Sequence, residues 1–160
     1  MADVHSPAQR SYNMSRIRGR DTKPEIILRQ GLHRAGLRFR LHASKLPGRP
    51  DLVFPRHHAA ILVHGCFWHG HNCPMFRLPA TRPEFWSAKI RANRERDSRA
   101  LTALRDSGWR VLTVWECSLK GPARLPLQEV LCGCAAFVRG TSPSATLTGS
   151  WPRLSRSAAN

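Results

Sequence analysis

The chain has 160 residues, 41% of them hydrophobic, so it can bury one core, and we expect one folded domain rather than a disordered chain. Its 26 Lys and Arg residues outnumber 10 Asp and Glu residues, and the formal net charge of +16 favours a polyanionic partner such as nucleic acid. The sequence has no apolar run of membrane-spanning length and no apolar signal core near its start, so we expect no membrane partner and a cytoplasmic protein.

The first half of the chain predicts a basic arm, one helix and three strands. Residues 1–20 carry several Arg and no acid after Asp3, which is typical of an arm that contacts DNA, with one helical turn around residues 12–17. A capping box at TKPE, residues 22–25, predicts a helix that ends near residue 35. Alternating or continuous apolar residues predict strands at 37–42, 51–54 and 59–64, the last of them central and buried.

The second half predicts a loop, a long helix, a strand and a shorter helix. Residues 65–80 read as loop, and a second capping box, TRPE at 81–84, predicts a helix to about residue 107. A strand at 109–115 would complete a crossover and pair in parallel with strand 59–64. A helix at 125–138 would hold Cys132 and Cys134 as small core residues.

These elements predict an α/β fold in which a mixed sheet of about four strands is flanked by helices. We expect the folded domain to span residues 21–138. Residues 139–160 are rich in Ser and Thr and lack acids, so we expect a disordered tail there.

A metal site is predicted in the loop HGCFWHGHNC, residues 64–73. An odd number of cysteines without a secretion signal favours metal ligation over disulfides. Cys66, His71 and Cys73 offer three zinc ligands, and the fourth has three candidates: His64, His69 and a distant cysteine. Cys117 is favoured because the carboxyl ends of parallel strands meet, which would bring it beside Cys66. Buried thiols with scattered histidines are the alternative.

Two acids have possible chemical roles. Asp51 begins a strand and either caps a turn or holds a divalent cation. Asp97 falls on the inner face of the long helix, where it either joins a structural ion pair or partners a functional histidine or metal site. Capping alone explains Glu25. His64 and His69 follow the central strand, where open sheets place their sites, and this combination suggests phosphodiester hydrolysis.

Phe67 and Trp68 lie between a metal ligand and a candidate base. Paired aromatics usually pack in a core, but exposed aromatics on a rigid loop can enter a base step and unstack it. Met14 in the basic arm could do the same.

The chain resembles the very short patch repair (Vsr) endonucleases, bacterial enzymes that nick DNA at T·G mismatches. Five stretches spanning residues 11–117 carry the resemblance: SYNMSRIRGRDTKPE (11–25), LPGRPDLVF (46–54), LVHGCFWHGHNC (62–73), PATRPEFWSAKIRANRERD (79–97) and SGWRVLTVWEC (107–117).

The resemblance implies a restriction-endonuclease-like core that cuts 5′ to the mismatched thymine. It implies that Asp51 binds a catalytic Mg²⁺ and that His69 is the base. It further implies that Glu25, His64 and Asp97 complete a polar cluster. It implies a structural Zn²⁺ site formed by Cys66, His71, Cys73 and Cys117. It also implies a DNA wedge formed by Phe67, Trp68 and Met14. Val63 stands where relatives can have Thr, so a metal bound there would need the backbone carbonyl of Val63.

These features predict a monomer that acts on double-stranded DNA with a T·G mismatch, with mismatch-repair proteins as candidate partners. One alternative is a non-catalytic, zinc-stapled DNA-binding module, which would leave Asp51 and Asp97 without a role. A second alternative is a general restriction-type nuclease, which would cut matched DNA.

Overall fold

The computed structural model describes residues 6–17 and 19–152 of the chain. Within these residues the strands form a single mixed sheet of five, in the spatial order β1-β2-β3-β4-β5. Their bounds are Arg40–Leu41 (β1), Leu52–Phe54 (β2), Ala59–His64 (β3), Arg110–Trp115 (β4) and Ser144–Leu147 (β5).

The centre of the sheet is the parallel pair β3 and β4, which confirms the predicted crossover. The pairing runs from Ala59 opposite Arg110 to His64 opposite Trp115, so both strands end at the same edge of the sheet. β1 and β2 extend the sheet on one side through antiparallel pairs, and β5 pairs in parallel with β4 on the other. The predicted strand at 37–42 is shorter than expected.

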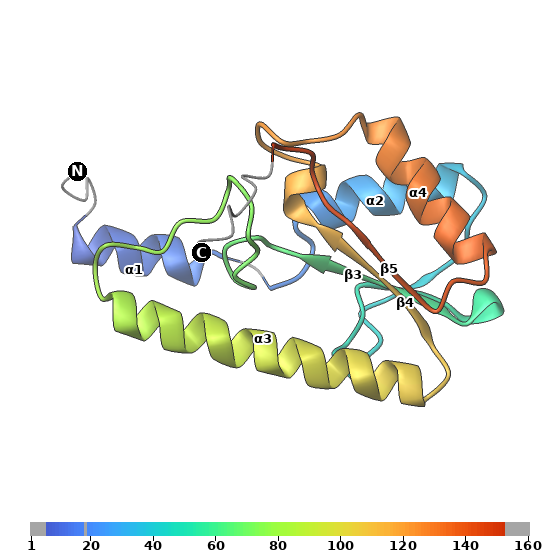
Figure 1. Ribbon diagram of the computed structural model, residues 1–160, viewed down its shortest axis with the longest axis horizontal. Helices are drawn as coiled ribbons and strands as arrows, with labels where there is room; N and C mark the ends of the chain where they lie inside the picture. Colours follow the sequence, from blue (N-terminus) through green and yellow to red (C-terminus); the bar gives the residue numbers. More distant parts are fainter. Residues whose placement is uncertain (1–5, 18, 153–160) are drawn as a thin grey trace, which may run out of the picture.

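Helices cover both faces of the sheet (Figure 1). The long helix α3 lies across one face, whereas α2 and α4 lie against the other. The helices are α1 (Pro7–Ser15), α2 (Lys23–Arg34), α3 (Pro83–Asp106) and α4 (Leu127–Arg139), with short 3-10 turns at Pro55–His57 (η1) and Glu116–Ser118 (η2).

Each face of the sheet buries its own core. The larger core joins α2 and α4 to the sheet through residues that include Leu28, Leu32, Phe54, Ile61, Leu112, Val130 and Val138. A smaller core joins α3 to the sheet through Leu62, Leu104 and Val111. Gly36 and Gly108 follow α2 and α3 with φ of 86° and 85°, the left-handed conformation that commonly terminates a helix.

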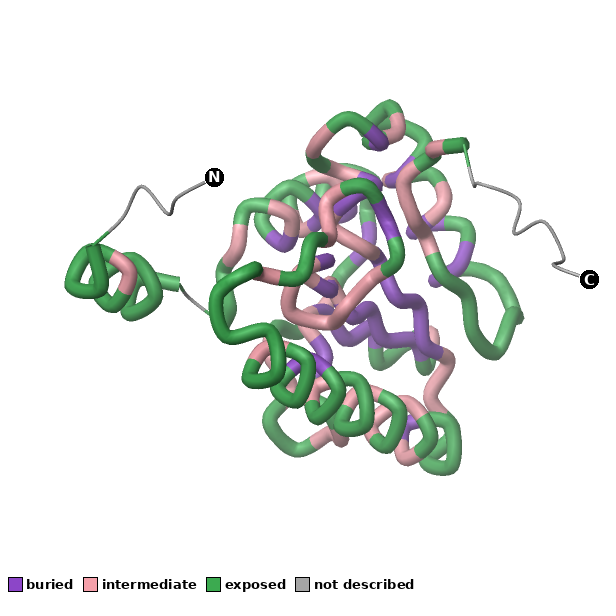
Figure 2. The backbone as a smooth tube through the Cα atoms, turned by 60° about the vertical axis from the view of Figure 1, so that its left-hand side comes forward, coloured by how far each residue is buried: buried purple, intermediate pink, exposed green. Residues whose placement is uncertain are grey.

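The N-terminal arm contains a full helix rather than one turn. α1 has no buried residue and stands clear of the main body (Figure 2). Residues 1–5 and Arg18 of the predicted arm lie outside the described residues.

Three predictions about individual elements are wrong. Residues 144–147 form β5, so this part of the predicted tail is ordered; residues 153–160 lie outside the described residues. α3 begins after Arg82, whose backbone is left-handed, and not at a capping box on Thr81. Cys132 is exposed because it falls on the outer face of α4, while Cys134 is buried as predicted.

Candidate active site

Asp51 lies directly before β2, beside the end of the central strand. Its Oδ2 accepts a hydrogen bond of 2.7 Å from the amide of Val63 on β3. Burial raises the pKa of Asp51 to about 6, and the nearby charge of Glu25 acts in the same direction. A largely buried carboxylate with a second acid close by attracts a cation.

Glu25 is buried near the start of α2 and is fully hydrogen-bonded. Its carboxylate accepts from the amide of Asp21 at 2.9 Å, from the hydroxyl of Thr22 at 3.1 Å and from Arg29 Nη2 at 2.9 Å. The Thr22 side chain does not cap the helix, so the predicted capping box is replaced by bonds from Thr22 and Asp21 to Glu25.

Arg29 and His42 extend this network, and both were missed from the sequence. Arg29 Nη2 lies 2.8 Å from His42 Nε2, and its Nη1 donates to Asp21 at 2.7 Å. Arg29 follows Glu25 at the helical spacing of four residues, a signal that predicts such a pair. His42 carries no comparable signal, because its contact depends on how β1 and α2 pack.

His64, His69 and Asp97 form a second polar group at the carboxyl end of β3. The two imidazole rings are stacked, with centroids 3.9 Å apart and planes within 2°. His69 Nδ1 hydrogen-bonds Asp97 Oδ2, so the inward face predicted for Asp97 on α3 is confirmed. Burial lowers the pKa of His64 to about 4, which keeps this ring neutral at neutral pH.

The pKa of Asp97 reflects two opposing effects. Burial raises it, but the hydrogen bond and charge of His69 outweigh burial, and the net result is a lowered pKa. Asp97 is therefore ionised at neutral pH and accepts the hydrogen bond from His69 Nδ1, which leaves Nε2 of His69 as the basic nitrogen.

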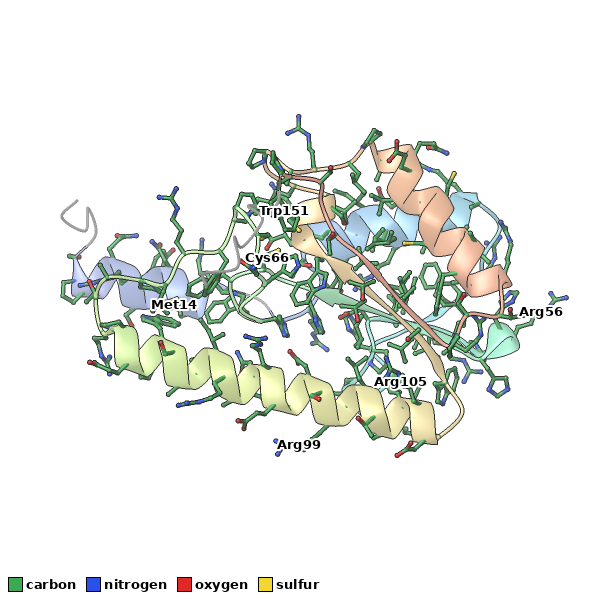
Figure 3. The ribbon with its side chains drawn as sticks, in the orientation of Figure 1. Met14, Arg56, Cys66, Arg99, Arg105 and Trp151 are labelled. Atoms are coloured by element: carbon green, nitrogen blue, oxygen red, sulfur yellow. The ribbon has the colours of Figure 1, made fainter. Side chains whose placement is uncertain are left out.

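Asp51 and Glu25, together with the group of His64, His69 and Asp97, open into one cavity of about 660 Å³. Its lining includes all five predicted catalytic residues, the predicted wedge and two basic side chains: Glu25, Asp51, His64, His69, Asp97, Met14, Phe67, Trp68, Lys89 and Arg96. Met14 contributes to this lining from α1 (Figure 3). The chain thus brings acids, imidazoles and aromatics from five separate segments to one opening.

Phe67 and Trp68 are half-buried, and they pack against Trp86 at the start of α3, with ring centroids 5.3 and 6.0 Å from it. Asn93 Nδ2 donates a hydrogen bond of 2.8 Å to the carbonyl of Trp68, which fixes the loop to the long helix. The aromatics are therefore held in place while remaining part of the cavity wall.

A candidate metal centre adjoins this loop. Cys66, His71, Cys73 and Cys117 each offer one ligand atom, and the four atoms lie within 4.8 Å of one another. His71 Nδ1 lies 3.6 Å from Cys66 Sγ and 3.5 Å from Cys117 Sγ. Burial raises the pKa of the Cys66 and Cys117 thiols. Buried thiols this close together need a cation to ionise, so the donor set fits a metal ion.

Glu116 is a further residue that the sequence analysis did not select. Its Oε2 accepts a hydrogen bond of 3.1 Å from the amide of Cys66, and it also lines the cavity. Glu116 directly follows β4 and precedes Cys117, so this bond links the end of β4 to the start of the aromatic loop.

A mixed sheet with carboxylates and imidazoles at the end of its central strand, on a chain of net charge +16, fits the class of phosphodiester hydrolases that act on nucleic acid. The family model for DNA mismatch endonuclease Vsr matches residues 2–75. Bacterial relatives that are 38–51% identical extend the match over 77–83% of the chain. The chain belongs to the DNA mismatch endonuclease Vsr family.

These relatives are bacterial proteins similar to most of the chain. The type II nicking enzyme V.XorIIP of Xanthomonas oryzae pv. oryzae is 51% identical over 82% of this chain and 98% of its own length. DNA mismatch endonuclease Vsr of Escherichia coli is 49% identical over 83% and 90%, respectively. The type II nicking enzyme V.NmeAIP of Neisseria meningitidis is 38% identical over 77% and 88%.

None of the described helices is long and apolar enough to cross a membrane.

Proposed function

We propose that this DNA mismatch endonuclease hydrolyses the phosphodiester 5′ to the thymine of a T·G mismatch, nicking one strand to start very short patch repair. One observation carries the proposal: the His69–Asp97 pair, Asp51 and the aromatic loop open into the same cavity. This cavity therefore holds groups for proton transfer, for phosphate chemistry and for contact with bases. We propose that the protein acts as a monomer in the bacterial cytoplasm.

In this proposal His69 is the general base. Asp97 accepts from Nδ1, which fixes the tautomer and leaves Nε2 to take a proton from water. His64 stacks on one face of His69 and is itself packed against Trp115, with centroids 5.2 Å apart. We assign His64 the role of holding the His69 ring. The buried, neutral His64 imidazole competes poorly with His69 for the proton of the attacking water.

We propose that Asp51 and the backbone carbonyl of Val63 hold a catalytic Mg²⁺. The Val63 side chain packs against the main core and has no hydroxyl group, so it offers no metal ligand. Mg²⁺ commonly uses one or two carboxylates and completes its shell with water and phosphate. When bound, the ion would stabilise the charge that develops on the phosphate. Glu25 lies beside Asp51 and would add to the attraction for the cation.

We propose that the Cys66, His71, Cys73 and Cys117 site holds a structural Zn²⁺. A tetrahedral zinc with Zn–S of about 2.3 Å and Zn–N of about 2.0–2.1 Å separates sulfur and nitrogen ligands by about 3.5 Å. The two distances from His71 Nδ1 to sulfur, 3.5 and 3.6 Å, agree with this value. Zinc would hold the two ends of the segment that contains Phe67, Trp68 and His69.

We propose that Phe67, Trp68 and Met14 enter the DNA beside the mismatch. A weakly paired T·G step is easier to unstack than a matched pair, which would favour the mismatched substrate. Lys89 and Arg96 line the same cavity and would contact phosphates. Mismatch-repair proteins are proposed as partners on the basis of this reaction.

The test is a nicking assay on end-labelled T·G and matched duplexes, with and without Mg²⁺. We expect one-strand cleavage of the T·G duplex in the presence of Mg²⁺ only. Asp51→Ala should lose nicking and retain DNA binding, whereas Asp106→Ala, which removes an exposed acid at the end of α3, should keep both. The absence of cleavage across sequence contexts would contradict the proposal, and equal cutting of matched DNA would favour a restriction-type nuclease.

A further inference from the structure

The segment at residues 144–151, which we call the C-terminal segment, contacts the candidate metal centre directly. It begins as β5, paired with β4, and continues to the end of the sheet where Cys117 lies. Trp151 packs against the cluster of Cys66, Cys73 and Cys117, and the labelled side chains Cys66 and Trp151 lie near each other in Figure 3.

Three contacts attach this segment to the metal centre and its surroundings. The amide of Gly149 donates a hydrogen bond of 3.3 Å to Cys117 Sγ. The amide of Ser150 donates one of 2.7 Å to the carbonyl of Ala123. The Trp151 ring meets the His71 ring edge to face, with centroids 5.8 Å apart.

The His71 ring is enclosed by two aromatic side chains. Trp115 stacks on it with centroids 4.1 Å apart and planes within 8°, and Trp151 approaches it at 90°. One of these side chains comes from β4 and the other from the C-terminal segment. The segment therefore supplies a wall that the sheet and the loop alone do not provide.

Gly149 is required at its position by close approach. A Cβ there would lie 2.5 Å from the carbonyl oxygens of both Ala123 and Cys117, closer than real atoms pack. The backbone of the segment is thus pressed against the chain around the metal ligand, and no side chain separates them.

We propose that the C-terminal segment is a closing strap for the metal centre, which slows loss of the metal and holds the Cys117 and His71 ligands in position. This proposal rests on the proposed zinc site. Amide hydrogen bonds to a ligand sulfur and contacts that fix a ligand imidazole are the outer contacts on which metal affinity depends. Gly149 and Trp151 are positioning residues, since each acts through a ligand.

The experiment measures zinc transfer from the purified full-length protein to a chromophoric chelator in the absence of DNA. Gly149→Ala should displace the strap, and Trp151→Ala should remove its aromatic contact. We expect each variant to release zinc faster by about tenfold or more. Trp151→Phe, which keeps an aromatic ring beside His71, should restore part of the retention.

Ser150→Ala is the matched control, because the hydrogen bond to the Ala123 carbonyl comes from the backbone amide of Ser150, which the substitution leaves in place. It should release zinc at the parent rate. Far-ultraviolet circular dichroism checks folding; if Gly149→Ala proves unfolded, Trp151→Ala and Trp151→Phe decide the matter. If the parent binds zinc and Trp151→Ala releases it at the parent rate, the strap alone is overturned. A parent that binds no zinc would overturn both the strap and the proposed zinc site.

Discussion

Replacing Asp51 with asparagine should stabilise the Mg²⁺-free protein at about pH 8 while abolishing nicking. The folded protein raises the pKa of this carboxyl from 3.8 to about 6, mainly through burial. A rise of this size corresponds to roughly 3 kcal/mol of unfolding free energy once the carboxyl is ionised in both states. Asparagine has a similar shape, and its oxygen can still accept the bond that Val63 donates at 2.7 Å.

The stability gained by Asp51→Asn should depend on pH, and the raised pKa of Asp51 sets the direction of this dependence. Between about pH 4 and pH 6 the folded protein keeps a proton that the unfolded chain has released, so stability falls as pH rises through this window. The asparagine variant has no such proton. Its advantage should therefore be about half developed at pH 5 and complete above about pH 7.

Urea unfolding followed by tryptophan fluorescence, at about pH 5 and about pH 8 with any bound zinc left in place, measures this effect. Asp106→Asn is the control, because Asp106 is exposed and should change stability little. The reasoning would be refuted if Asp51→Asn were less stable than the parent at pH 8, or if its gain were the same at both pH values.

Three further substitutions test the other parts of the site. Asp97→Asn should lower the single-turnover nicking rate by about 100-fold or more with an unchanged Kd for DNA, since His69 loses the partner that fixes its tautomer; an unaltered rate would remove Asp97 from the reaction. Cys117→Ser should weaken zinc binding by about tenfold or more, measured by chelator competition, while Cys132→Ser, at an exposed thiol, should not. Phe67→Ala should cost roughly 1–3 kcal/mol in affinity for T·G duplexes, measured by fluorescence anisotropy; full retention would assign Phe67 to packing on Trp86 alone.

Apolar runs and helical periodicity in the sequence predicted the central parallel pair of strands and the inner face of α3. The apolar run at 59–64 and the helix between two strands were sufficient for the central parallel pair, because a right-handed crossover leaves few other arrangements. That pair in turn placed Cys117 near Cys66. Helical periodicity placed Asp97 on the inner face of α3, and the structure shows His69 beside it.

The errors occur where long-range packing overrides local preference. Residues 144–147 alternate polar and apolar side chains over only four positions, yet they add a fifth strand because the exposed edge of β4 offers hydrogen bonds. Arg82 adopts a left-handed backbone that no local signal indicates, and this shifts the start of α3 past the expected cap. The network of Arg29 and His42 around Glu25 forms only after α2 and β1 have packed together.

The parallel pairing of β3 and β4 also determines when activity can arise during folding. Glu25, Asp51 and His69 all precede α3 in the chain, whereas Asp97 lies on α3 and Cys117 follows β4. In the proposed site, a chain synthesised only as far as residue 82 would have the base His69 without Asp97 and the Cys66 loop without Cys117. The proposed cutting site would therefore be complete only after β3 and β4 have paired, which would restrict cleavage to the folded enzyme.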